Sequence, residues 1–147
     1  MRRSSFIFFC FLLTFLQIIL QACQTEAELN FARYYTNGSQ VYSQHCANCH
    51  GVKGEGLGKL YPPLTDSTFL IKNKNSLACI VKYGLNDTIT VNNTIFSTIM
   101  PADTHLANMD IAAVITYITN SFGNKQGLYS VENAGTDLKA CRQGNED

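Results

Sequence analysis

The pentapeptide CANCH, which runs from Cys46 to His50, constrains this chain more than any other feature. Two cysteines separated by two residues and followed by histidine are the attachment signature of a c-type haem. The spacing has a chemical reason. The thiols of Cys46 and Cys49 must reach two vinyl groups on one haem edge, so they must lie about one helical turn apart. His50 is then placed beneath the iron as one axial ligand. Because a five-residue pattern also arises by chance, other features of the chain are needed to show whether CANCH is a haem-attachment motif.

The N-terminus has the pattern of an export signal. Arg2 and Arg3 precede an apolar run from Phe6 to Leu20, which gives a basic n-region and a hydrophobic h-region. The run has 15 residues, whereas a membrane-spanning helix usually needs about 20. We therefore expect an exported protein, in the compartment where haem attachment of this kind takes place.

The signal ends in LQAC, Leu20 to Cys23, which resembles the bacterial lipobox. In that motif the signal is cut before the cysteine, which is then acylated. The sequence thus predicts a lipoprotein-type signal peptide over residues 1–22 and a lipid on Cys23. The protein would be anchored on the periplasmic side of a bacterial membrane, since several acyl chains give stable anchoring. A plain cleaved signal and an uncleaved anchor remain alternatives.

The remainder of the chain has the size of one domain. We expect a tether over residues 23–36, a folded domain over residues 37–124 and a C-terminal tail over residues 125–147. Two of the eleven basic residues lie in the signal, so nine face eleven acidic residues in the rest. With this slightly acidic balance, no basic stripe and no Trp, nucleic-acid binding has no support.

The cysteine count leaves one pair without an assignment. Of six cysteines, one lies in the signal and three are accounted for by lipid and haem. Cys79 and Cys141 remain. In an oxidising compartment two such thiols often form a disulfide, which would hold the tail to the middle of the domain. Two unrelated thiols are the alternative.

Periodicity and turn residues predict mainly helices. A helix is expected from about Asn37 into CANCH, because Asn is a good N-cap residue. The Gly- and Pro-rich segment that follows predicts a loop, and the tail gives no clear pattern. The other expected elements are a helix over Ser76–Tyr83, a small hairpin over Thr88–Phe96 and an apolar-striped helix over Asn108–Phe122.

A haem bound at CANCH requires two axial ligands. His50 is the fifth ligand, and its other ring nitrogen needs a hydrogen-bond acceptor. A backbone carbonyl of Pro62 or Pro63 is suited to this role, because the proline-rich loop must fold back under the haem.

Met100 is the leading candidate for the sixth ligand. It lies on an expected loop, and Pro101 restricts it to extended conformations. His105 is close enough in sequence to be a rival, although a surface position suits it better. Met109 is expected in the core, and His45 is expected to be exposed or hydrogen-bonded.

These features together resemble class I cytochrome c. The chain has CANCH after a helix with Gly38 and Tyr42, a loop ending in YPPL, an isolated IMP and a last helix with VITYI, in that order. The resemblance covers Asn37–Asn124. It implies an all-α fold of three to four helices around one covalently attached haem c, with a minor β-hairpin.

The resemblance also implies particular contacts and relatives. Gly38 and Tyr42 would cross the last helix near Tyr117, while Leu64 and Pro63, with residues near Ile99, would pack against the haem. The similar subgroup contains haem domains or partner subunits of copper nitrite reductases and quinoprotein alcohol dehydrogenases, together with free periplasmic carriers.

We expect an electron-transfer protein rather than an enzyme. A mono-haem cytochrome with His/Met ligation would carry single electrons between periplasmic or membrane-bound redox proteins. The alternative is a dedicated subunit of a membrane-associated reductase, oxidase or dehydrogenase. A haem with an open sixth position and a zinc site are less favoured, the latter because structural zinc sites usually need a second ligand pair.

Overall fold

The computed structural model describes Phe9, residues 11–14 and residues 25–143. Contacts divide the chain into two compact units, residues 1–30 and residues 31–147, and the second contains the hydrophobic core and the cavity described below. Most of the expected signal peptide, together with Cys23, lies outside the described residues. Within the described part, no helix combines the length and hydropathy needed to cross a membrane.

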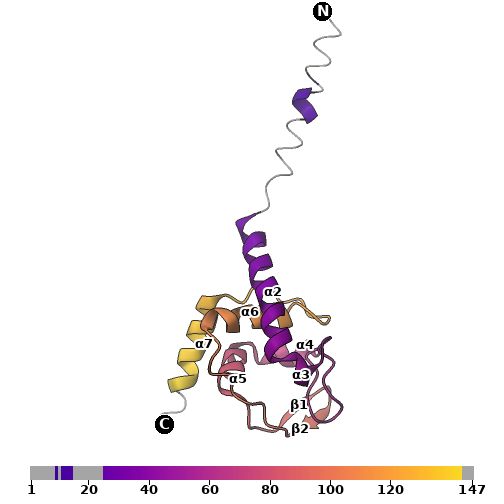
Figure 1. The fold of residues 1–147 in the computed structure, drawn as a ribbon, viewed down its shortest axis with the longest axis vertical. Helices are drawn as coiled ribbons and strands as arrows, with labels where there is room; N and C mark the ends of the chain where they lie inside the picture. The colour runs from indigo at the N-terminus through magenta and orange to yellow at the C-terminus, as the bar shows by residue number, and fades with distance from the viewer. Residues whose placement is uncertain (1–8, 10, 15–24, 144–147) are drawn as a thin grey trace, which may run out of the picture. The chain divides into compact units, whose positions relative to one another are not determined.

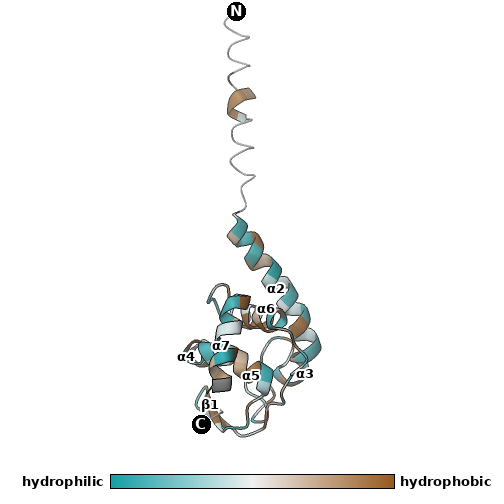
Figure 2. Cartoon of the chain, turned by 90° about the vertical axis from the view of Figure 1, so that its left-hand side faces the viewer, coloured by the Kyte–Doolittle hydropathy of each residue, from teal (hydrophilic) through white to brown (hydrophobic). Residues whose placement is uncertain are grey.

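The first long helix, α2, spans Glu26–His45, so residues 26–36 of the expected tether are helical. A reciprocal cap begins the helix: Thr25 N–H donates to Glu28 at 3.2 Å, and Glu28 N–H donates to the Thr25 hydroxyl at 3.3 Å. Tyr34 is buried, and its hydroxyl accepts from the backbone N–H of Val131 at 3.2 Å. The end of the expected tether is therefore part of the domain. Figure 2 shows hydrophilic and hydrophobic residues interspersed along this helix.

The next helices are short. The last four residues of CANCH form α3, Ala47–His50. A helix not expected from the sequence, α4, spans Ser67–Lys72, and the Asp66 carboxylate caps it by accepting from two backbone N–H groups. A 3-10 turn, Lys74–Ser76, leads into α5, Leu77–Tyr83, which confirms the expected helix there.

The predicted hairpin is present. Strands β1, Ile89–Val91, and β2, Thr94–Phe96, pair antiparallel, with Ile89 opposite Phe96. Asn92 and Asn93 have φ values of 48° and 58°, the left-handed conformation that a two-residue type I′ turn requires.

The apolar helix α6 spans Asn108–Ile118 and is buried along nearly its whole length. It ends four residues before the predicted Phe122, because side-chain donors form hydrogen bonds with its last backbone carbonyls. The Thr119 hydroxyl donates to Ile115 O at 2.6 Å, and the Asn120 amide donates to Thr116 O at 2.7 Å. Such bonds compete with helix continuation.

The C-terminal tail contains a helix that the sequence did not predict. Helix α7 spans Val131–Gln143 and packs against α5 and α6 through buried Ala134 and Leu138. A disulfide joins Cys79 in α5 to Cys141 in α7, with a Cα–Cα distance of 6.2 Å. This is the pairing that the cysteine count favoured, and closing so long a loop stabilises the fold by about 4 kcal/mol in the chain-entropy model.

The predicted fold class is confirmed, with α4 and α7 added to the expected helices (Figure 1). Helices α2 and α6 cross in close contact at Gly38. A Cβ added to Gly38 would overlap the backbone carbonyl of Ala113 and lie 2.8 Å from the Cβ of Tyr117. Glycine at this position therefore allows the two helix backbones to touch.

Gly38→Ala should lower the free energy of unfolding by about 1–3 kcal/mol, because the added methyl group must push α6 away from α2. Urea denaturation of the holoprotein measures the change. Gly135→Ala in α7 is the matched control, since the nearest atom to its added Cβ is 4.0 Å away. That control should raise stability by about 0.5–1 kcal/mol through helix propensity. Equal effects at both positions would contradict a close contact at Gly38.

Candidate haem site

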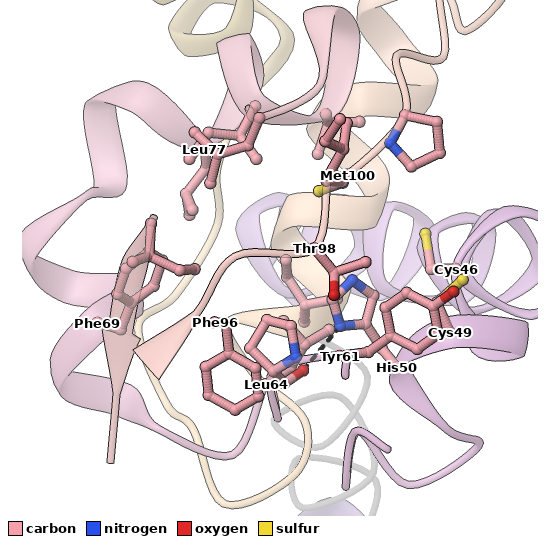
Figure 3. Close-up of a pocket in the computed structure, with 18 of the residues that line it drawn as sticks. Cys46, Cys49, His50, Tyr61, Leu64, Phe69, Leu77, Phe96, Thr98 and Met100 are labelled. Atoms are coloured by element: carbon pink, nitrogen blue, oxygen red, sulfur yellow. Dashed lines mark hydrogen bonds between the residues drawn. The ribbon is translucent and has the colours of Figure 1, made fainter. Parts of the chain in front are cut away.

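An apolar cavity lies in the part of the domain that follows α2 (Figure 3). The cavity volume is about 110 Å³. Segments far apart in the sequence form its walls. They are the CANCH segment, the loop after it, α4, α5, the hairpin and the Met100 segment.

His50 is fixed in one orientation. Its Nδ1 lies 2.9 Å from the carbonyl oxygen of Pro62 and donates to it, so the predicted backbone acceptor is Pro62 rather than Pro63. Burial lowers the pKa of His50, and the hydrogen bond to Pro62 opposes this effect. A neutral ring that donates from Nδ1 keeps the lone pair of Nε2 free for a metal.

The loop that carries Pro62 is folded back by backbone hydrogen bonds. Gly56 N–H donates to His50 O at 2.8 Å, and Leu64 N–H donates to Gly54 O at 2.8 Å. Gly54 has a positive φ, and a Cβ there would meet the ring of Phe122. The glycines of this loop therefore bring the carbonyl of Pro62 beneath the imidazole.

Cys46 and Cys49 line the same cavity as His50. They are free thiols in the structure. Burial raises the pKa of Cys46 to about 11, with smaller electrostatic contributions from Asp103 and Cys49. Cys46 is therefore a neutral thiol at pH 7, in apolar surroundings that suit a thioether equally well.

Met100 reaches the cavity from another direction. It pairs with Leu85 in an isolated antiparallel bridge: Leu85 N–H donates to Met100 O at 3.0 Å, and Met100 N–H donates to Leu85 O at 2.9 Å. Gly84 leaves room for this approach, because a Cβ there would overlap the carbonyl of Met100. In Figure 3, Met100 enters on the segment drawn above the cavity and His50 lies below it.

The rival ligands lie elsewhere. His105 is exposed and is not among the residues that line the cavity. Met109 is 46% exposed, so its expected place in the core is wrong: it lies on the solvent side of α6. His45 is hydrogen-bonded, as expected, and its partner is Asp103 at 2.7 Å.

The packing residues are partly as expected. Leu64 and Ile99 line the cavity, whereas Pro62 takes the place expected for Pro63. The sequence did not identify several other lining residues, which come from α4, α5 and the hairpin. They include Phe69, Leu77, Ile80, Leu85 and Phe96.

An aromatic cluster supports the CANCH segment from behind. The Tyr42 hydroxyl donates to the carbonyl of Gly51 at 2.5 Å, directly after the motif. Its ring packs on Tyr117 and Phe122, with centroid distances of 5.4 and 5.3 Å. The expected contact of Tyr42 with the last helix near Tyr117 is therefore present, and it connects the helix crossing to the motif.

The donor set fits a c-type haem. Two thiols and an imidazole with a free Nε2 share one wall of an apolar cavity, and a thioether lies in another wall. In the described part of the chain, no three His, Cys, Asp or Glu side chains gather as a multi-ligand metal site would require. The zinc alternative thus gains no support.

This fold and this site define a small helical domain of the haem-binding type. The family model of cytochrome c matches residues 35–121, more than half of the chain. The chain belongs to the cytochrome c family, whose members transfer electrons through covalently attached haem c with its iron.

Three relatives illustrate the similarity. The cytochrome c subunit of a quinone alcohol dehydrogenase from Gluconobacter oxydans is 31% identical over 69% of this chain and 21% of its own length. Cytochrome c-552 of Thermus thermophilus is 30% identical over 60% of this chain and 70% of its own length. The cytochrome subunit of a fructose dehydrogenase from Gluconobacter japonicus is 31% identical over 66% and 21%. The chain thus spans about a fifth of the dehydrogenase subunits.

Proposed function

We propose that this chain is a mono-haem cytochrome that carries single electrons between redox proteins on the periplasmic side of a membrane. The haem would be attached through Cys46 and Cys49, with His50 and Met100 as axial ligands. The observation that carries the proposal is that one apolar cavity is lined by all four of these side chains. Haem bound there supplies the one-electron couple of its iron.

The protein side chains would set the properties of that couple. Pro62 holds the His50 ring and leaves Nε2 free, while the bridge to Leu85 holds the backbone of Met100. Methionine ligation raises the reduction potential, and the apolar walls act on it by limiting solvent access. With both axial positions filled by side chains, no position is left for a substrate, so the function is electron transfer rather than catalysis.

Met100→Ala should remove the methionine–iron charge-transfer band of the oxidised protein and lower its reduction potential. The reduced variant should bind carbon monoxide rapidly and stoichiometrically, whereas the native protein should bind it only slowly, because the methionine sulfur competes for the iron. Met109→Ala is the control, because Met109 is a methionine on the surface and should leave all three measurements unchanged. A Met100→Ala variant with a native spectrum would contradict the ligation.

A dedicated subunit is the second candidate, because two of the relatives are cytochrome subunits of dehydrogenases. A carrier makes brief contacts at the small end of the range of interface areas, whereas a subunit stays bound. Purification of the full chain from its own membranes in mild detergent distinguishes the two. A dehydrogenase or reductase in equimolar amount would establish the subunit; cytochrome eluting alone, at unchanged yield through a salt wash, would establish the carrier.

We further propose that Cys23 carries lipid, on the strength of the LQAC pattern. The native protein should then be found with membranes and move into the detergent phase on phase separation. Cys23→Ser should abolish this partitioning. Cys10→Ser, a substitution inside the expected signal, should leave it intact. Detergent partitioning of the Cys23→Ser protein would show that the anchor is something other than this lipid.

A further inference from the structure

A polar pair joins the two parts of the chain that would supply the axial ligands. Nδ1 of His45 lies 2.7 Å from Oδ2 of Asp103, although the residues are 58 positions apart. The two side chains are 37% and 28% exposed, so the pair lies at the edge of the domain. None of the roles assigned so far explains it.

The positions of His45 and Asp103 in the chain show which segments the pair connects. His45 is the last residue of α2 and directly precedes Cys46, the first residue of CANCH. Asp103 follows Met100 by three residues. The Asp103 carboxylate is also close enough to Cys46 to contribute to the raised pKa of that thiol. The pair therefore connects the Met100 segment to the start of the haem-attachment segment.

The other hydrogen bonds of the Met100 segment lead to α5 and the residues after it. Leu85 pairs with Met100, and the Lys82 ammonium donates to the carbonyls of Thr104 and Leu106 at 2.7 and 2.6 Å. Asp103 N–H donates to Val81 O at 3.4 Å. These contacts hold the segment to one wall of the cavity but do not fix the distance between that wall and CANCH.

We propose that His45 and Asp103 are positioning residues that set this distance and so keep the Met100 sulfur on the iron. The proposal rests on the proposed His50 and Met100 ligation. Without the pair, the Met100 segment can move with α5 away from CANCH, and the sulfur leaves the iron for a larger fraction of the time. A ligand from solution, which competes with the sulfur, reports that fraction directly.

Substitutions at His45 test the proposal with a matched control. In His45→Asn the amide nitrogen can occupy the place of Nδ1 and still donate to Asp103. In His45→Gln the amide nitrogen reaches the place of Nε2 instead, and His45→Ala has no donor. We expect the rate of carbon monoxide binding to the reduced holoprotein to rise about two- to fivefold in His45→Gln and His45→Ala, in line with the small effect of partly exposed pairs. His45→Asn should keep the native rate.

The reduction potential separates ligand loss from a simple charge effect. Removing the Asp103 carboxylate in Asp103→Asn takes away a negative charge and by itself raises the potential, whereas loss of methionine lowers it. Asp103→Asn should therefore bind carbon monoxide faster even if its potential rises. In the double variant His45→Ala/Asp103→Asn, carbon monoxide should bind no faster than in the more affected single variant.

A further variant separates a loss of stability from a loss of methionine ligation. Tyr129→Phe removes the hydrogen bond from Tyr129 to Asp137 in α7, away from the cavity, and should lower stability without changing carbon monoxide binding. If native protein lacks the methionine–iron charge-transfer band, the proposed ligation fails. If the band is present but His45→Gln and His45→Ala bind carbon monoxide at the native rate, the ligation stands and the positioning role is overturned.

Discussion

The contact between α2 and α6 at Gly38 is the constraint on which the rest of the domain depends. Because no side chain separates the backbones there, Tyr42, one turn later, packs on Tyr117 of α6. The hydroxyl of Tyr42 then reaches the carbonyl of Gly51 and holds the residue directly after CANCH. A core contact between two helices thus determines where the cysteines and His50 lie, although none of them takes part in it.

Local sequence chemistry explains which parts of the fold could be predicted. The hairpin was predictable because Asn92 and Asn93 tolerate the positive φ values of its turn. The start of α2 was missed although Thr25 and Glu28 form a capping box, since the segment after them has no strong apolar period. The tail was missed for a related reason. Helix α7 buries few apolar residues, and it depends on α5, α6 and the disulfide to Cys79 for its packing.

The candidate site also has residues that the sequence predicts and residues that only the fold brings together. Cys46, Cys49 and His50 form a local motif, and Met100 is marked by the proline that follows it, so the sequence alone names all four as candidates, and all four line one cavity. Most of the cavity wall could not be, because Phe69, Leu77 and Phe96 are ordinary apolar residues until the fold brings them together. The choice between Pro62 and Pro63 was open for another reason: it depends on how the glycine loop turns, which the order of residues does not specify.

The two sides of the site are held by different kinds of interaction, and this difference decides which side can respond to its surroundings. On the CANCH side, two covalent bonds would fix the haem, and a buried imidazole is oriented by the Pro62 carbonyl. On the other side, Met100 is held by the bridge to Leu85 and by the partly exposed pair of His45 and Asp103, and Ile99 beside it is 60% exposed. Local opening costs least where few buried contacts hold the backbone. Changes in temperature, in ionic strength or in a bound partner should therefore act on the methionine side first, while the haem stays attached through CANCH.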